Sequence, residues 1–313
     1  MSCEFTSPWG MWRMRSSAVL LAVLALCAMV GFGGPAASAA PVLDGSAPPP
    51  GANDWRCKPS AAHPDPVVLV HGTWGNQDTW NKLAPALKAQ GYCVYALNYG
   101  HDTASLLGRM PGIYGTGDIG KSAVQLANFV GKVRAATSSA HVDMVAHSQG
   151  GVVARQYMRF AGGADLADPK RNVVRKLVTL GATNHGSTSV LLGYPLDTAS
   201  GSGPLGGAVS SVLGVSAVQQ ITGSRFLNRL NAGGDTVPGV DYTVIATRMD
   251  DTTTPPESTF LRAGPRAVVD NVWVQTVCAG ADVTHVGFPR SPIAIRLILR
   301  ALDPSYSGRV CGR

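Results

Sequence analysis

Between Pro66 and Thr276, short runs of β-branched and other apolar residues alternate with stretches whose apolar residues recur every three or four positions. The runs predict buried strands, and the stretches predict amphipathic helices. The predicted strands cover 67–70, 92–98, 141–145, 176–180, 242–247 and 272–276. Strands that alternate with helices in this way indicate an α/β fold with a mostly parallel central sheet and helices on both faces.

Capping residues place two of the helices. Asp118 precedes a stretch with helical spacing of apolar residues, which predicts a helix that Asp118 caps. An earlier helix is predicted over 78–90, with Asp78 or Thr79 as its cap. Pro85 either kinks this helix or delays its start.

Residues 1–39 have the pattern of a secretory signal peptide. Two arginines precede the apolar run 18–30, and the small residues 37–39 suit a cleavage site. The run is shorter than the roughly 20 residues that a membrane span needs. We therefore predict a signal peptide over 1–39, one domain over 40–313, secretion to the extracellular space and no stable membrane anchor.

Removal of the signal peptide leaves four cysteines, Cys57, Cys93, Cys278 and Cys311. An even count in an exported chain predicts two disulfides. We favour Cys57–Cys93, which flanks adjacent early elements, and Cys278–Cys311, which would hold the C-terminus. Since no C-x-x-C pair or clustered histidines support a zinc site, we expect no metal ion.

The formal net charge is +7 at pH 7, and charged residues make up 14% of the chain. The basic residues are scattered along it. Proteins that bind nucleic acid usually gather such residues into a stripe with interleaved aromatic residues. We therefore expect no nucleic-acid partner. As a separate expectation, we take the protein to be a monomer.

The pentapeptide Ala146-His147-Ser148-Gln149-Gly150 lies between the predicted strand 141–145 and a predicted helix over 151–160. In the nucleophile elbow of α/β-hydrolases, a serine on such a turn holds its hydroxyl clear of the sheet. Ala146 differs from the usual first glycine of G-x-S-x-G by one methyl group. Ser148 is the predicted nucleophile, and an ordinary glycine-containing turn is the alternative interpretation.

A serine nucleophile needs an imidazole that takes its proton and a carboxylate that orients the imidazole. In this fold the chain order is serine, acid, histidine, and Ser148, Asp250 and His285 satisfy it. Spacing alone leaves Asp251 as a second candidate for the acid. The other candidate bases, which all precede the acid, are His71, His147 and His185.

Ester hydrolysis also needs two N–H groups that face the developing oxyanion. The N–H of Gln149, directly after the serine, is the first candidate. The second is the N–H of Thr73, in the turn after the strand 67–70. A simple tight turn is the alternative interpretation of His71-Gly72.

Five segments together resemble the secreted bacterial class 2 triacylglycerol lipases of the α/β-hydrolase superfamily. They are 69–74 (LVHGTW), 145–151 (VAHSQGG), 183–187 (TNHGS), 228–239 (NRLNAGGDTVPG) and 247–255 (TRMDDTTTP). The similarity runs from about Trp55 to Cys311. In that family the triad acid is the aspartate directly after a Thr-Arg-aromatic step. The resemblance therefore implies that Asp250 is the triad acid here. Met249 replaces the usual aromatic residue here.

The resemblance implies a lipase that cleaves acylglycerol esters through an acyl-enzyme, without a cofactor, on a lipid or ester substrate at a lipid–water interface. The same triad would serve a short-chain esterase, a polyester hydrolase or an acyltransferase. A binding protein without catalysis is the remaining alternative. The stretch 187–239, rich in Gly and Ser but containing several leucines and valines, either walls or covers an acyl-binding groove or forms a fixed surface excursion.

Overall fold

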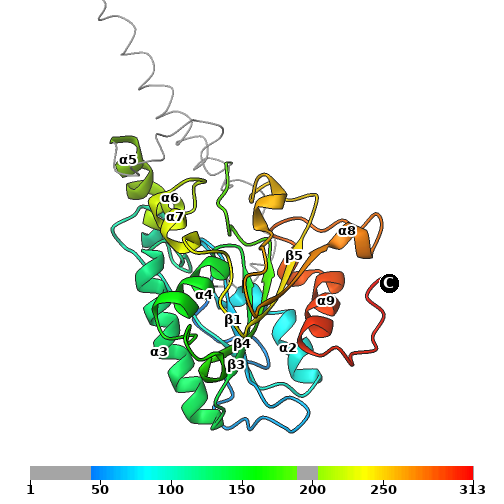
Figure 1. Cartoon of the computed structure of the whole chain (residues 1–313). Helices are drawn as coiled ribbons and strands as arrows, with labels where there is room; N and C mark the ends of the chain where they lie inside the picture. Colours follow the sequence, from blue (N-terminus) through cyan, green and yellow to red (C-terminus); the bar gives the residue numbers. More distant parts are fainter. Residues whose placement is uncertain (1–43, 189–203, 313) are drawn as a thin grey trace, which may run out of the picture. The chain divides into compact units, whose positions relative to one another are not determined.

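A computed structural model describes residues 44–188 and 204–312 (Figure 1). Within them, six strands form a sheet in the order β2-β1-β3-β4-β5-β6. The strands are β1 (Val67–Val70), β2 (Val94–Ala96), β3 (Val142–His147), β4 (Val174–Leu180), β5 (Asp241–Ala246) and β6 (Val268–Trp273). Every pairing between neighbours is parallel, which confirms the predicted parallel sheet.

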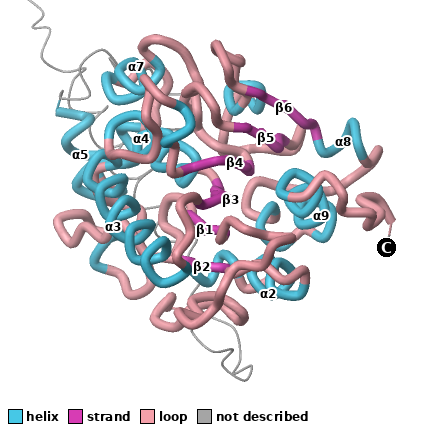
Figure 2. The backbone as a smooth tube through the Cα atoms, turned by 60° about the horizontal axis from the view of Figure 1, so that its bottom comes forward, coloured by secondary structure: helices cyan, strands magenta, loops and turns pink. Residues whose placement is uncertain are grey.

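Helices cover both faces of the sheet, as predicted. In Figure 2, α3 and α4 lie on one side of the row of strands, and α2 and α9 lie on the other. The described α-helices are α2 (Leu83–Ala89), α3 (Ile119–Thr137), α4 (Gln149–Phe160), α5 (Pro204–Leu213), α6 (Val215–Gln219), α7 (Arg225–Asn231), α8 (Val274–Val277) and α9 (Pro292–Leu302). Short 3₁₀ turns cover Gln77–Trp80, Leu107–Arg109, Pro169–Arg171, Pro256–Thr259 and Phe288–Arg290.

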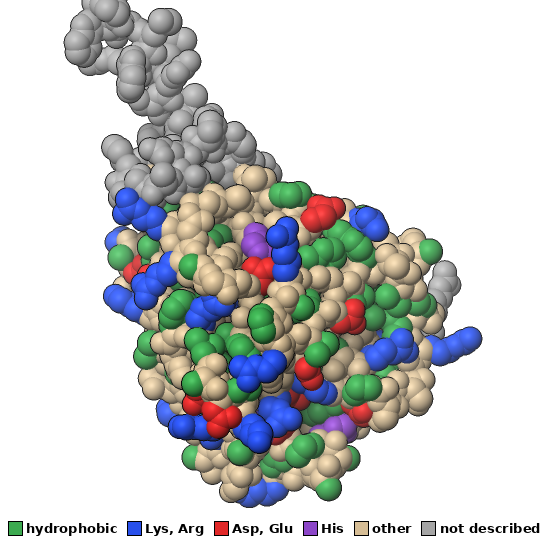
Figure 3. Space-filling view, in the orientation of Figure 1, with side chains coloured by type: hydrophobic (Ala, Val, Ile, Leu, Met, Phe, Trp, Pro, Cys, Tyr) green, Lys and Arg blue, Asp and Glu red, His purple; other side chains and the backbone are tan. Residues whose placement is uncertain are grey.

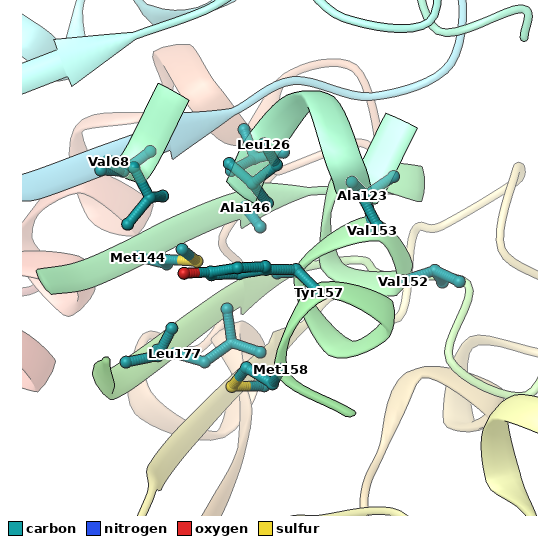
Figure 4. Close-up of a cluster of buried hydrophobic side chains, with 14 of the residues drawn as sticks. Val68, Ala123, Leu126, Met144, Ala146, Val152, Val153, Tyr157, Met158 and Leu177 are labelled. Carbon is teal, nitrogen blue, oxygen red and sulfur yellow. The ribbon is translucent and has the colours of Figure 1, made fainter. Parts of the chain in front are cut away.

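Successive residues of a strand point to opposite sides, so the fully buried strands β1 and β3 place side chains in the core on both faces of the sheet, whereas the edge strand β6 is largely exposed. Val68 of β1 belongs to the apolar cluster with α3 and α4, and its neighbour Leu69 belongs to the cluster with α2 and α9. Figure 4 shows part of the first cluster, where the ring of Tyr157 from α4 reaches toward Met144 of β3. The two clusters hold the carboxyl ends of the strands in fixed positions.

Two local predictions agree closely with the structure. β1 has the predicted bounds. The side chain of Asp118 accepts a hydrogen bond from the N–H of Lys121 at 2.8 Å, and α3 begins at the next residue, Ile119. A strong cap followed by a long apolar stripe therefore fixes this helix locally.

The helix predicted over 78–90 is wrong in its first part. The chain makes a 3₁₀ turn over Gln77–Trp80, and α2 begins only at Leu83. Pro85 lies in the first turn of α2, where its missing N–H would have no intrahelical partner. The proline therefore delays the helix and does not kink it.

The strand predicted over 272–276 is wrong in its second half. β6 ends at Trp273, and Val274–Val277 forms the short helix α8. β6 is an edge strand whose pairing with β5 ends at Ala246, directly opposite Trp273. Beyond that point the β-branched residues have no neighbouring strand to bind, so the backbone makes helical hydrogen bonds instead.

Two disulfides join Cys57 to Cys93 and Cys278 to Cys311, the pairs that we favoured from the sequence. Their partners are 36 and 33 residues apart. In the chain-entropy picture, loops of this length make each disulfide worth about 3–4 kcal/mol of stability. The second disulfide links the chain after α8 to the C-terminal segment, close in sequence to His285.

The described residues, 44–188 and 204–312, belong to one compact unit. The predicted signal peptide, 1–39, lies outside the described residues. Within 44–188 and 204–312, none of the helices combines the length and the apolar character that a membrane crossing requires. On the face that Figure 3 shows, Lys and Arg side chains are interspersed with acidic and apolar ones.

Candidate active site

Ser148 occupies the turn between β3 and α4, with φ 54° and ψ −127°. This region is unfavourable for residues other than glycine and costs on the order of 1–3 kcal/mol. The turn packs closely against the end of β1, the parallel neighbour of β3, and this approach requires glycine at position 150, because a Cβ atom there would lie 2.2 Å from the carbonyl oxygen of Val70. Ala146 is fully buried in the core, so the methyl group in place of the usual glycine is accommodated.

Asp250 and His285 meet at the carboxyl edge of the sheet. Nδ1 of His285 lies 2.9 Å from Oδ2 of Asp250, and the two side chains are almost inaccessible to solvent. Oδ1 of Asp250 accepts hydrogen bonds from the N–H groups of Thr252 at 3.0 Å and Thr253 at 2.7 Å. These bonds orient the carboxylate, and the carboxylate favours the His285 tautomer with its hydrogen on Nδ1 and a lone pair on Nε2.

The loop after β4 brings this pair beside the elbow. A Cβ atom at Gly181 would lie 2.8 Å from Oδ2 of Asp250 and 3.1 Å from Nδ1 of His285, so the approach requires glycine. Leu180 is the residue before Gly181, and its carbonyl accepts a hydrogen bond from the N–H of Ser148 at 2.9 Å. Within the described part of the chain, the Ser148 hydroxyl makes no hydrogen bond with His285. Such bonds often shorten only when substrate binds.

Asp251, the competing acid, makes different contacts from Asp250. It is exposed, and its carboxylate accepts a hydrogen bond from the hydroxyl of Thr252. Of these two aspartates, Asp250 is the one whose carboxylate contacts an imidazole.

The three competing histidines bind other groups. Nδ1 of His71 lies 2.8 Å from the carbonyl of Gly72, Nε2 of His147 lies 2.9 Å from the carbonyl of His285, and Nε2 of His185 lies 3.0 Å from Asp235. Burial lowers the pKa of His71 to about 4 and that of His147 to about 3. Bases with such low pKa values take up protons poorly at neutral pH.

Thr73 and Gln149, the candidate oxyanion residues, lie on two turns in contact. A Cβ atom at Gly72 would lie 2.9 Å from Cβ of Ser148. The side-chain amide nitrogen of Gln149, Nε2, donates to Oγ1 of Thr73 at 3.1 Å and to the carbonyl of Gly115 at 2.9 Å. Gln149 also begins α4, and the first N–H groups of a helix have no partner within it.

Gln220, a buried residue that contacts one of these turns, is not predicted from the sequence. Its Nε2 donates to Oγ1 of Thr73 at 2.9 Å, and its Oε1 accepts from the hydroxyl of Thr183 at 2.8 Å. Thr73 is 147 residues away in sequence. No local pattern distinguishes a glutamine at the end of a short helix, so only the folded contact identifies it.

The stretch 187–239 is partly anchored to the same turn. The indole N–H of Trp74 donates to the carbonyl of Leu213 at 2.9 Å, at the end of α5. A small apolar cluster that includes Val209 and Val218 joins α5 to α6. Residues 189–203 lie outside the described residues. For this part of the stretch, both predictions, a moving cover and a fixed surface excursion, stay open.

Two motifs without a role in the predicted triad, 183–187 and 228–239, meet in a polar cluster. Nε2 of His185 lies 3.0 Å from Oδ1 of Asp235, and Nδ1 lies 2.9 Å from the carbonyl of Ser258. Both partners are acceptors, so both ring nitrogens carry hydrogens when both bonds form. The hydrogen bond with Asp235 accordingly raises the pKa of His185. Arg155, buried in α4, donates to the carbonyl of Asp235 and attaches the cluster to the helix after Ser148.

Replacement of His185 by glutamine should lower the free energy of unfolding more at acidic than at alkaline pH. Because the folded-state pKa of His185 is raised, its stabilisation is complete below the unfolded pKa of about 6.5 and is lost as pH rises through the folded value. The side chain is 37% exposed, so we expect at most about 0.5–1 kcal/mol. Urea unfolding of wild type and H185Q at pH 6 and pH 9 checks this prediction. The same difference in free energy of unfolding at both pH values would contradict it. Asp235→Asn should show the same trend.

Within 44–188 and 204–312, no group of three or more His, Cys, Asp or Glu side chains is placed to hold a metal ion. A cavity of about 330 Å³ lies between the loop after β2 and α3, lined in part by Tyr99, Tyr114, Phe129 and Lys132. It lies beside the candidate site and contains none of its residues.

Comparison with known proteins shows what this chain is similar to. The family model described as "Lipase (class 2)" matches residues 64–274. The structure of lipase B from Aspergillus fumigatus aligns with a TM-score of 0.60 at 20% identity, covering 85% of this chain and 60% of that one. The mature lipase BlEst2 from Bacillus licheniformis aligns with a TM-score of 0.52 at 16% identity, covering 78% of this chain and 94% of that one. This chain thus spans about three fifths of the Aspergillus protein, and the structural likeness shows a shared α/β-hydrolase fold.

Proposed function

The chain belongs to the class 2 lipase family, and from that premise we propose that it is a secreted carboxylic-ester hydrolase that cleaves acylglycerols through Ser148, Asp250 and His285. The observation that carries the proposal is the buried contact of 2.9 Å between His285 and Asp250 beside the Ser148 elbow. A carboxylate so placed orients the imidazole and stabilises its charged form.

In the first half of the proposed reaction, the Ser148 oxygen attacks the ester carbonyl carbon while Nε2 of His285 takes the hydroxyl proton. The carbonyl oxygen becomes an oxyanion, which the N–H groups of Thr73 and Gln149 would stabilise. The intermediate then collapses with cleavage of the bond to the alcohol oxygen. His285 gives its proton to that oxygen, and the alcohol leaves an acyl group on Ser148.

In the second half, water replaces the alcohol. His285 takes one proton from the water as its oxygen attacks the acyl carbon, and the same N–H groups stabilise the second oxyanion. Cleavage of the bond to Ser148 returns the proton to the serine oxygen and releases the carboxylic acid. Each proton taken by His285 is returned, so the protein is unchanged after one turnover.

Exposed apolar side chains next to the proposed catalytic residues support a lipid substrate. Trp74 follows Thr73, Met249 precedes Asp250 and Val286 follows His285, and these three side chains are 37%, 46% and 74% exposed. Apolar groups at the rim of a site favour contact with acyl chains. We infer a lipid or ester substrate, taken from a lipid–water interface.

We also propose that the protein is exported, with residues 1–39 removed. The two disulfides support this location, because disulfides persist mainly in oxidising compartments. A monomer remains our expectation for the mature chain.

Covalent labelling together with substrate comparison tests the proposed function. We expect the mature, oxidatively folded chain to hydrolyse both emulsified long-chain triacylglycerol and soluble p-nitrophenyl butyrate. A fluorophosphonate should stop both activities and add its mass to the peptide that contains Ser148. A serine nucleophile held beside a base reacts with such reagents much faster than an ordinary serine does.

Three outcomes would revise the proposal. Labelling at another serine would show that the nucleophile is misassigned. Hydrolysis of the butyrate ester alone would identify an esterase with a restricted pocket. An unlabelled, inactive but correctly folded chain would favour a binding protein.

A further inference from the structure

His147, the residue before Ser148, contacts the main chain of His285. Its Nε2 lies 2.9 Å from the carbonyl oxygen of His285, and the two ring centroids are 4.8 Å apart. His147 is the last residue of β3, and it is buried. The residue covalently attached to the proposed nucleophile is therefore hydrogen-bonded to the proposed base.

The direction of this hydrogen bond follows from its acceptor. A carbonyl oxygen can only accept, so Nε2 of His147 carries the hydrogen and donates it. Burial, together with repulsion from His285, lowers the pKa of His147 to about 3, which keeps its ring neutral. The ring can therefore hold His285 without placing a second positive charge beside it when His285 becomes protonated.

The remaining contacts of His285 fix its ring more firmly than its main chain. Asp250 binds the ring through Nδ1, while the carbonyl of His285 accepts a second, longer bond of 3.4 Å from the N–H of Phe288. Val286, the next residue, is mostly exposed to solvent. Thr284 forms a bridge with Met249, and the carbonyl of Val283 accepts a hydrogen bond from Thr247, so the chain before His285 is held to the segment after β5. The bond from His147 ties the carbonyl of His285 itself to the end of β3, next to the elbow.

We propose that His147 is a positioning residue whose bond to the carbonyl of His285 keeps the imidazole within reach of the Ser148 hydroxyl. The inference rests on the proposed function, since it presupposes that Ser148 and His285 react together. Proton transfer needs the two heavy atoms about 2.6–3.2 Å apart. A displacement of about 1 Å can lower the rate about 100-fold. Loss of the donor should therefore lower kcat and leave KM nearly unchanged.

Two amide variants form a matched pair for the test. Glutamine can place an N–H donor where Nε2 of His147 lies, whereas asparagine places the same group near the position of Nδ1, too short to reach the carbonyl. We expect kcat on p-nitrophenyl butyrate to stay within about 5-fold of wild type in H147Q and to fall about 10- to 100-fold in H147N. KM should change by less than about 2-fold in both. H147L, which has no donor, should behave like H147N.

Active-site titration separates positioning from folding. Each rate is divided by the amount of Ser148 that a fluorophosphonate titrates, at a temperature well below unfolding of every variant. A purely structural role would lower the unfolding temperature but leave kcat per titrated serine unchanged, and that result would overturn the inference. The inference would also be overturned if kcat per titrated serine were as low in H147Q as in H147N. If H147L does not fold, the comparison of the two amides still decides. Failure of the wild-type chain to react at Ser148 would instead reject the proposed function.

Discussion

Replacement of Ser148 by alanine should lower kcat/KM for p-nitrophenyl butyrate by about 10⁴- to 10⁶-fold and remove measurable hydrolysis of emulsified triacylglycerol. In the proposed reaction no acyl-enzyme can form without this hydroxyl, and the remaining N–H donors could assist only direct attack by water. The unfolding temperature should change little, because serine and alanine experience similar backbone strain at the φ of 54°. Initial rates and thermal unfolding of the two purified chains check both parts.

Ser307→Ala is the matched control for this substitution. Ser307 is an exposed serine near the C-terminus, so the same chemical change there should leave the rates at their wild-type values. Retention of more than about one hundredth of wild-type activity by S148A would show that another residue is the nucleophile.

The sequence predicts the parts of the fold that depend on local patterns. The run Val67–Val70 is apolar throughout because β1 is buried on both faces, so its bounds can be predicted directly. Asp118 and the apolar stripe after it define α3 in the same way. Val274–Val277 shows where this reasoning stops, since its residues favour a strand but the neighbouring strand ends first. Strand length depends on a partner that lies elsewhere in the sequence.

In the candidate site, too, only the features that depend on adjacent residues can be predicted from the sequence. A strand–turn–helix pattern is enough to predict Ser148 as the nucleophile, because the turn and the residues beside the serine are adjacent in sequence. The contact between His147 and His285 spans 138 positions, and the contact between Gln220 and Thr73 spans 147. A single sequence has no pattern for such pairs. Their function depends on which loops the sheet order brings together, and the sheet order becomes visible only in the fold.

Asp250 illustrates how geometry adds evidence where spacing leaves two candidates. Both Asp250 and Asp251 follow β5, and the sequence resemblance alone favours the first. In the fold, Asp250 is buried against His285, while Asp251 is exposed and binds only a neighbouring hydroxyl among the described contacts. Substitution of each by asparagine, which preserves shape and removes charge, therefore distinguishes them by activity.

Asp250→Asn should lower kcat by about 10⁴-fold, and Asp251→Asn should leave it within about 3-fold of wild type. The N–H groups of Thr252 and Thr253 both point at Oδ1 of Asp250, so the asparagine oxygen is expected there and its NH₂ group toward His285. That NH₂ would donate to Nδ1 and force the histidine hydrogen onto Nε2. Nε2 could then no longer accept the proton of Ser148. Steady-state kinetics of both variants test this expectation, and a slow D251N with a near-normal D250N would transfer the role of the acid to Asp251.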